Sequence, residues 1–266
     1  MGDDVMIAKR HIILVHGACH GAWSWYKVAT HLRSAGHRVT APDLVASGVD
    51  ERRFEDLRTF TEYTQPLLGI LSSLPPGERV ILVGHSLGGL SIAFAMDEFP
   101  EKIAAGVFVT ALMPDSVNPP SHVFNQLNWQ EKTTAATWSD TELGTVGDKE
   151  KGPLSMLFGP KTLAKLYCLS PPEDLTLAMS LVRPSSVFME DLSSSPPLSR
   201  SGYGSAQKIY VVCGKDEAIS ESYQRWMIEN NPVKEVKEIE EADHMPMMST
   251  PTQLSEMILD VAERYI

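Results

Sequence analysis

One seven-residue segment, residues 83–89, constrains the fold of this chain more than any other. It reads Val-Gly-His-Ser-Leu-Gly-Gly and contains the pattern G-x-S-x-G. A short apolar run at 80–83 precedes it, and apolar residues at helical spacing follow it. The pattern alone also occurs in ordinary loops rich in glycine and serine. Strand, sharp turn and helix in this order instead indicate a nucleophile elbow, which holds the Ser86 hydroxyl above the edge of a sheet.

The rest of the chain alternates between strand and helix patterns. Between 115 and 200, prolines, serines, aromatics and methionines replace this rhythm. We therefore predict an α/β protein with the α/β-hydrolase fold, in which helices cover both faces of a mostly parallel central sheet and a cap is inserted. Residues 1–114 and 201–266 would form the two parts of the core, and residues 115–200 the cap. Apolar runs predict strands near 11–15, 38–41, 79–83, 103–112, 208–213 and 233–239, and helical spacing predicts helices near 23–34, 59–73, 161–169, 172–182, 221–229 and 251–265.

The composition argues against several classes of protein. With 266 residues, 43% of them hydrophobic, the chain is long enough to bury the core of one domain. A formal net charge of −11 argues against nucleic acid or a membrane surface as a partner, because both attract basic patches. Three widely spaced cysteines suggest neither a disulfide framework nor a metal site. Because no apolar run reaches the ~20 residues of a membrane span and no secretory signal is evident, we expect a cytoplasmic protein.

Ser86 needs a general base, because a serine hydroxyl is a poor nucleophile at neutral pH. In this fold the acid and the histidine follow the serine in the chain, on loops after later strands. Asp216 comes just after the strand predicted at 208–213, and His244 lies between the last strand and the last helix. We expect His244 to take the proton of Ser86 and Asp216 to hold the imidazole in the required tautomer.

Two other acidic residues compete with Asp216. Asp243 is the sequence neighbour of His244, so its carboxylate would reach the far ring nitrogen awkwardly, and we expect it to be solvated or to fasten the loop. Glu217 is a weaker rival for the same reason of placement. The sequence therefore favours Asp216 as the acid of a Ser-His-Asp triad.

The remaining histidines are expected to serve structure. His16, His20 and His85 lie in or beside the catalytic loops, where we expect them to orient the loops rather than to act as bases. His85 in particular is the second residue of the elbow, whose side chain points away from the nucleophile. The other four are expected at the surface or at strand ends: His11, His31, His37 and His122.

An oxyanion hole should be formed by two backbone N–H groups, one from the residue after the nucleophile and one from the loop after an early strand. These positions correspond to Leu87 and Ala18. Gly17 suits the second position, because a glycine lets the backbone approach the substrate carbonyl closely. The alternative is a plain Gly-Ala turn with no such role.

Three segments of the chain resemble the plant family of methylesterases and hydroxynitrile lyases: His-Gly-Ala-Cys-His-Gly-Ala-Trp at 16–23, Gly-His-Ser-Leu-Gly-Gly at 84–89 and Ala-Asp-His-Met at 242–245. The stretches at 181–186 and 203–205 are also similar to that family. The resemblance implies an enzyme without cofactor or metal that acts on a small-molecule ester, usually as a homodimer. Its expected substrates are small carboxylic methyl esters of the salicylate, jasmonate, indole acetate or alkaloid type.

Two positions separate hydrolysis from lyase activity within this family. The hydroxynitrile lyases have a threonine where this chain has Gly17 and a lysine where it has Met245, and these two side chains bind the cyanohydrin hydroxyl and stabilise cyanide. Gly17 and Met245 do neither, so hydrolysis is the predicted reaction. A small-molecule receptor on the same fold is the competing hypothesis, because fold alone does not define function.

The resemblance also implies which residues line the substrate pocket between the sheet and the cap. For several of them, plain packing within the cap is the stronger interpretation. The candidates are Gly17, Trp138, Leu143, Phe158, Leu181, Val187 and Met245.

Overall fold

A parallel sheet forms the centre of the molecule in the computed structural model, which describes residues 9–130, 140–145 and 154–265. Neighbouring strands follow the order β2-β1-β3-β4-β8-β9, and each neighbouring pair is parallel. This confirms the predicted fold class. The strands are β1 (His11–Val15), β2 (Arg38–Thr40), β3 (Val80–His85), β4 (Ile103–Val109), β8 (Lys208–Cys213) and β9 (Glu235–Ile239).

The burial of the strands explains their sequence pattern. Every residue of β1, β3, β4 and β8 is buried, because these strands lie inside the sheet and are covered on both faces. Continuous apolar runs are typical of such strands. The edge strand β9 instead alternates between exposed and more buried residues. Its sequence, Glu-Val-Lys-Glu-Ile, does not follow this alternation, because Val236 is exposed while Glu235 and Lys237 are half-buried.

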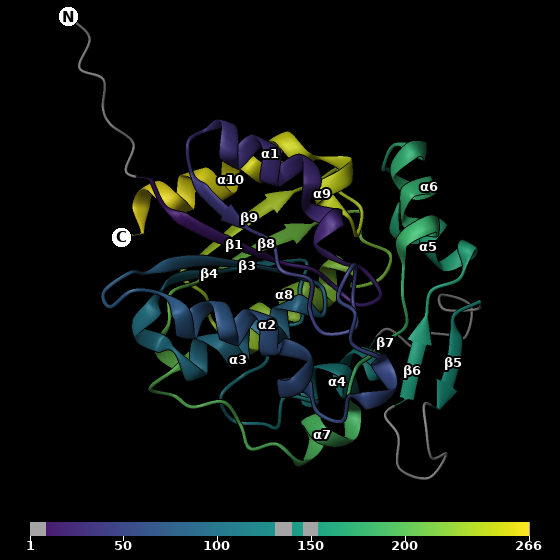
Figure 1. Ribbon diagram of the computed structural model, residues 1–266, viewed down its shortest axis with the longest axis horizontal. Helices are drawn as coiled ribbons and strands as arrows, with labels where there is room; N and C mark the ends of the chain where they lie inside the picture. Colours follow the sequence, from purple (N-terminus) through teal and green to yellow (C-terminus); the bar gives the residue numbers. More distant parts are fainter. Residues whose placement is uncertain (1–8, 131–139, 146–153, 266) are drawn as a thin grey trace, which may run out of the picture.

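Helices cover both faces of the sheet, as predicted. Figure 1 shows α1 and α10 on one face and α2 and α3 on the other. A capping box between Thr59 and Glu62 begins α2, and Gly36, with φ of +92°, follows the end of α1. Within the described ranges, no helix is long and apolar enough to cross a membrane. These helices are α1 (Tyr26–Ser34), α2 (Phe60–Ser73), α3 (Gly88–Glu98), α8 (Glu221–Asn230), α9 (Pro246–Ser249) and α10 (Pro251–Arg264).

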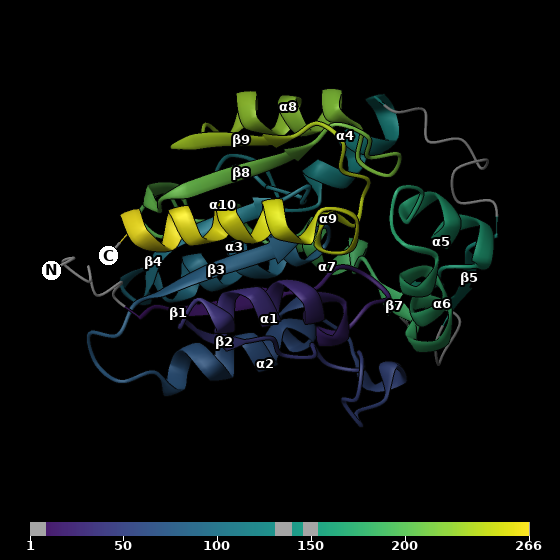
Figure 2. The same ribbon diagram turned by 90° about the horizontal axis from the view of Figure 1, so that it is seen from above.

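The segment between β4 and β8, here called the insertion, has its own architecture. It contains an antiparallel sheet in the order β5-β6-β7, which the sequence patterns did not predict. Figures 1 and 2 show β5, β6, α5 and α6 beyond the carboxyl ends of the parallel strands. The cap boundaries at 114 and 200 stay a prediction. The elements are α4 (His122–Gln130), β5 (Glu142–Thr145), β6 (Leu154–Leu157), α5 (Pro160–Leu166), α6 (Pro172–Leu181), β7 (Ser185–Ser186) and α7 (Met189–Ser194).

Buried polar contacts fasten the insertion to the core. Asp174 on α6 is 1% exposed and accepts hydrogen bonds from the hydroxyl of Tyr26 at 2.8 Å and from the ammonium of Lys27. The guanidinium of Arg183 donates to the carbonyl oxygens of Gly48 and Asp50 at 2.9 and 2.7 Å. A buried charge is tolerated when it is paired in this way. These contacts hold α6 and the residues after it against the core.

The strand order brings two loops together at one edge of the sheet. The chain runs from β1 outward to β2 and then returns to place β3 on the other side of β1. The loops that follow β1 and β3 therefore leave the sheet at a topological switch point, where α/β proteins bind their ligands. Val15 at the end of β1 is level with Gly84 near the end of β3. The loop at 16–21 consequently lies beside the elbow.

Candidate active site

Ser86 sits in the sharp turn between β3 and α3. Its φ is +52°, in the left-handed region that residues with a side chain seldom adopt. The turn closes tightly, because a Cβ atom on Gly84 would lie 2.6 Å from the carbonyl oxygen of Gly88, and one on Gly88 would lie 2.6 Å from that of His16. Both glycines of the G-x-S-x-G pattern are thus required, because neighbouring backbone atoms leave no room for a side chain at either position. This is the strained elbow geometry that projects a serine from the sheet edge.

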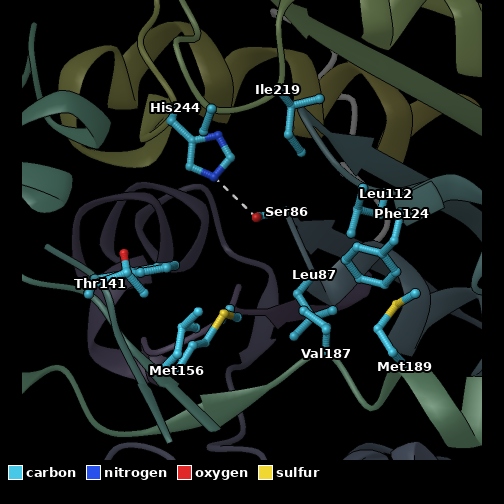
Figure 3. Close-up of a pocket in the computed structure, with 14 residues that line it drawn as sticks. Ser86, Leu87, Leu112, Phe124, Thr141, Met156, Val187, Met189, Ile219 and His244 are labelled. Carbon is cyan, nitrogen blue, oxygen red and sulfur yellow. Dashed lines mark hydrogen bonds between the residues drawn. The ribbon is translucent and has the colours of Figure 1, made fainter. Parts of the chain in front are cut away.

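Ser86, His244 and Asp216 are joined by hydrogen bonds. His244 Nε2 lies 3.1 Å from Ser86 Oγ, and His244 Nδ1 lies 2.7 Å from Asp216 Oδ2. Figure 3 shows the imidazole of His244 directed at Ser86 among the residues that line a cavity. The three residues come from loops that follow β3, β8 and β9, whose carboxyl ends meet at the same edge of the sheet.

The carboxylate of Asp216 has a hydrogen-bond donor for every lone pair. Its Oδ1 accepts from the N–H groups of Ala218 and Ile219 at 2.6 and 2.9 Å, and its Oδ2 accepts from the hydroxyl of Thr110 and from His244. Because an ionised carboxylate only accepts, His244 must carry its proton on Nδ1. His244 Nε2 is then free to accept the Ser86 proton, which is the orientation that a general base requires.

Asp243, the rival acid, is fully buried but faces away from the imidazole of His244. Its Oδ1 accepts from the N–H of Met245 and the hydroxyl of Ser249, at 2.9 and 2.8 Å. Its Oδ2 accepts from the N–H of Leu169 and the hydroxyl of Ser170, both at 2.9 Å. Asp243 therefore fastens the loop of His244 to the insertion, as one reading of the sequence anticipated.

Ala18 and Leu87 line the cavity beside Ser86, and their N–H groups donate no hydrogen bond to any described residue. The peptide between Gly17 and Ala18 is oriented by His16. Leu44 N–H donates to His16 Nε2 at 3.0 Å, so Nδ1 carries the proton and donates to the Gly17 carbonyl oxygen at 2.9 Å. Since the N–H of a trans peptide points opposite to its carbonyl, this bond also fixes the direction of the Ala18 N–H.

His85 and His20 brace the same two loops. His85 Nε2 donates to the carbonyl oxygen of His244 at 2.7 Å, and its ring centroid lies 4.8 Å from that of His244. His20 contacts the Ala18 carbonyl oxygen and the Tyr167 hydroxyl, each at 2.8 Å, and stacks on the Tyr167 ring. The expected loop-orienting role of these residues thus has a concrete geometry.

Burial keeps these three histidines neutral. Desolvation lowers the pKa of His16, lowers that of His20 to about 4, and lowers that of His85 well below 6.5. His11 is the first residue of β1 and His37 directly precedes β2, so both lie at strand ends, one of the two places that the sequence suggested, and both are buried. Burial likewise lowers the pKa of each.

We expect the protein to lose stability in acid because of His20. Its pKa in the folded state, about 4, lies below the ordinary 6.5, so the unfolded chain binds a proton that the folded chain refuses. The stability is fully present above pH 6.5 and is lost as the pH falls toward 4, by on the order of 3 kcal/mol for this residue. Urea unfolding at pH 7, 6 and 5 measures the loss. His20→Gln should flatten the curve, and an unchanged slope in that variant would contradict the assignment.

Gly17 is held close to the elbow. A Cβ atom at this position would lie 2.9 Å from the Cβ of Ser86 and 3.0 Å from Nδ1 of His85. A threonine here, as in the lyases that the sequence resembles, would need the elbow to shift. Met245, the other discriminating position, is fully buried. The geometry at both positions is thus unlike a site with a threonine and a lysine at these places.

A cavity of about 320 Å³ opens beside Ser86 and His244. Three of the predicted pocket residues line it: Leu143, Phe158 and Val187. Leu181 is 39% exposed and Met245 is inaccessible, and neither lines the cavity; Gly17 does not line it either, and Trp138 lies outside the described residues. The lining residues, many of them labelled in Figure 3, are Ala18, Ser86, Leu87, Leu112, Phe124, Thr141, Leu143, Met156, Phe158, Val187, Met189, Ala218, Ile219 and His244.

Several wall residues escaped sequence reasoning. Leu112 follows β4, and Ala218 and Ile219 follow Asp216, so their position after a strand of the parallel sheet was a usable signal. Phe124 and Met189 belong to helices of the insertion, and no motif marks them. Apart from Ser86, Thr141 and His244, every described side chain of the wall is apolar.

The fold and the site together define a serine hydrolase of the α/β-hydrolase class. The model of the alpha/beta hydrolase family matches residues 12–257. Salicylic acid-binding protein 2 of Nicotiana tabacum is 52% identical over 257 residues, which are 96% of this chain and 98% of that protein. Methyl jasmonate esterase 1 of Vitis vinifera is 47% identical, over 97% of this chain and 98% of that protein.

A solved structure extends the likeness to three dimensions. The crystal structure of polyneuridine aldehyde esterase, 42% identical in sequence, superposes with a TM-score of 0.93 and covers 96% of this chain and 99% of that chain. The chain belongs to the plant methylesterase family of α/β-hydrolases. This confirms the family resemblance that the sequence motifs indicated.

Proposed function

We propose that this methylesterase hydrolyses methyl esters of small, largely apolar carboxylic acids through an acyl-enzyme on Ser86. One observation carries the proposal: Ser86, His244 and Asp216 are hydrogen-bonded in series, and Ser86 and His244 line a cavity of about 320 Å³ with a mostly apolar wall. Such a wall favours an uncharged ester over a charged ligand.

The proposed reaction has two halves. Ser86 Oγ attacks the ester carbonyl while its proton passes to His244 Nε2, and the N–H groups of Ala18 and Leu87 stabilise the oxyanion by about 3 kcal/mol each. The tetrahedral intermediate expels methanol, which takes the proton from His244. Water then attacks the acyl-enzyme with His244 as the base, releasing the acid and restoring Ser86. Asp216 stabilises the imidazolium in both halves.

The size of the cavity and the names of the relatives together suggest the acid portion of the ester. The relatives are named for salicylic acid and for methyl jasmonate, and the structural neighbour for polyneuridine aldehyde. The cavity lies near the lower end of the range that binds small molecules in proteins, ~300–1,000 Å³. Methyl esters of salicylate, jasmonate, indole-3-acetate or an alkaloid acid are therefore the candidate substrates.

We expect Ser86-dependent turnover of at least one natural methyl ester. The assay measures kcat/KM for the methyl esters of salicylate, jasmonate and indole-3-acetate beside p-nitrophenyl acetate, with the Ser86→Ala variant as the blank. The kcat/KM of a favoured ester should exceed that of the others by about tenfold or more, because one well-fitted methylene group contributes ~1–3 kcal/mol to the binding of the transition state. Activity on p-nitrophenyl acetate alone would redirect the search to larger alkaloid esters.

A receptor on the same fold is the second candidate, favoured by the name of the Nicotiana relative, which records binding of salicylic acid. In that case the panel would give no turnover, and the acids or esters would bind without being consumed. Cyanide release from mandelonitrile would reveal lyase activity, which the close packing at Gly17 disfavours.

We also propose that the chain is a cytoplasmic homodimer. Cys19 and Cys213 are buried free thiols, which suits a reducing compartment. Leu169, Met179 and Leu181 are 47%, 45% and 39% exposed on and before α6, and apolar side chains of this kind favour an interface between two copies. Light scattering after size exclusion measures the mass: a monomer would contradict the dimer.

A further inference from the structure

Among the described residues of the cavity wall, one beyond the proposed catalytic residues carries a hydroxyl group. Thr141 comes just before β5 in the insertion and lines the cavity, and Figure 3 shows it near Met156. A single polar group in an apolar pocket usually fixes the orientation of the ligand. Whether the hydroxyl of Thr141 can donate a hydrogen bond to a ligand, or only accept one, depends on whether it already donates its proton to another residue of the protein.

The hydrogen bonds behind Thr141 begin at a carboxylate. Asp140 accepts from the N–H groups of Lys161 and Thr162 at 2.6 and 2.9 Å and from the hydroxyl of Thr162 at 2.7 Å. Burial raises the pKa of Asp140, but these hydrogen bonds outweigh it, so that the pKa lies below its ordinary value. Asp140 is therefore ionised at neutral pH and only accepts hydrogen bonds.

The direction of each bond then follows. Thr162 has one hydroxyl proton and gives it to Asp140. The Thr162 oxygen lies 3.1 Å from the oxygen of Thr141, and with its own proton committed it can only accept there. The hydroxyl of Thr141 must be the donor in that pair. Its oxygen consequently has lone pairs to offer a ligand, but no proton.

The same contacts hold Thr141 in place. Thr162 is 1% exposed. The two N–H groups that donate hydrogen bonds to Asp140 belong to the first turn of α5. Asp140 thereby caps this helix, which reduces the freedom of the residue that follows it. An acceptor that is already oriented binds a ligand donor with less loss of entropy.

We propose that Thr141 is a specificity-determining residue that accepts a hydrogen bond from a hydroxyl or N–H group on the acid portion of the ester. This proposal rests on the methylesterase function proposed above and narrows its substrate class. An ester with a hydrogen-bond donor at that place can donate to the oxygen of Thr141. An ester with only an acceptor there places its own lone pairs against those of Thr141, and the two repel each other. Within the described part of the chain, the rest of the wall carries no other side-chain oxygen or nitrogen outside Ser86 and His244.

Matched esters test the proposal. Methyl indole-3-acetate and methyl benzothiophene-3-acetate have similar shapes but differ in an N–H group, and methyl 4-hydroxyphenylacetate and methyl 4-methylphenylacetate differ in a hydroxyl. We expect the chain to favour the donor-bearing member of at least one pair by about fivefold in kcat/KM, the effect of one net hydrogen bond in a partly solvated site. Thr141→Val should remove this preference, and Thr141→Ser should keep it.

A second variant tests the direction of the hydrogen bonds. Thr162→Val keeps the shape of Thr162 and leaves the hydroxyl of Thr141 free to donate as well as accept. Turnover of an acceptor-bearing ester, methyl 4-acetylphenylacetate, should then rise severalfold relative to methyl 4-hydroxyphenylacetate. An unchanged ratio in this variant would overturn the assigned direction.

Binding separates this proposal from the proposed function. The dissociation constants of both ester pairs are measured by calorimetry with the Ser86→Ala variant and with Ser86→Ala combined with Thr141→Val. A donor preference that depends on Thr141 supports the acceptor even if the wild-type chain turns over no ester, in which case only the hydrolytic function fails. If the preference for the donor-bearing ester were the same with and without the Thr141 hydroxyl in both pairs, Thr141 would not be the hydrogen-bond acceptor, and the proposal would be overturned.

Discussion

Ser86→Ala is expected to lower kcat for methyl ester hydrolysis by about 10⁵-fold, because the residual rate then comes only from binding and the oxyanion donors. His244 Nε2, 3.1 Å from Ser86 Oγ in the wild-type protein, would lose its proton donor. The esters should still bind, since the apolar wall of the cavity is unchanged. Steady-state kinetics and calorimetry on the same variant measure the two effects.

The backbone strain at Ser86 gives this prediction a matched second variant. With φ at +52°, an alanine at position 86 keeps the left-handed strain, whereas a glycine does not. Ser86→Gly should therefore be as inactive as Ser86→Ala but more stable by about 1 kcal/mol, or roughly 2 °C in melting temperature. If the two variants melted together, the elbow would not be strained. Substantial activity in either would remove Ser86 from the role of nucleophile.

The parts of the site that sequence could predict are those fixed by local chain geometry. Gly84, Ser86 and Gly88 lie within one turn, and their pattern needs only a strand before it and a helix after it. Asp216 and His244 each follow a recognisable strand, and parallel strands end at the same edge of the sheet. The order of the strands then brings three distant loops together without further information from the sequence.

The cavity wall could not be predicted in the same way. Its outer half comes from the insertion, where the antiparallel strands β5 and β6 are short and mix polar with apolar residues. Met245 adjoins His244 in sequence, yet its side chain turns into the core, and Leu181 sits on the outer side of α6. Neighbourhood in sequence was a poor guide to the wall, because side-chain direction is set by packing against elements far along the chain.

The choice between the two aspartates shows the same limit. Asp216 and Asp243 are both buried beside the His244 loop, and sequence could only rank them. Their partners decide the matter: Asp216 bonds to the imidazole, while Asp243 reaches residues of the insertion that are 73 and 74 positions earlier in the chain. Such long-range pairing leaves no local signature.

Asp216→Asn is expected to lower kcat by about 10⁴-fold while the protein stays folded. The amide oxygen of the asparagine must face the N–H groups of Ala218 and Ile219, because these buried donors otherwise lose their acceptor. The amide NH₂ group then points at His244 Nδ1 and donates to it. His244 is forced to carry its proton on Nε2, where it donates to Ser86 instead of accepting from it, and the general base is lost.

Asp243→Asn is the matched control, since it makes the same chemical change to a neighbouring buried carboxylate with four hydrogen bonds. Here the asparagine leaves one or two donors without an acceptor, so the free energy of unfolding should fall by about 2 kcal/mol. The tautomer of His244, held by Asp216, is unchanged, and kcat should fall by less than about tenfold. Kinetics and urea unfolding on both variants thus separate the two roles. Equal losses of kcat would mean that either carboxylate can hold the imidazole, and a larger loss for Asp243→Asn would reverse the assignment.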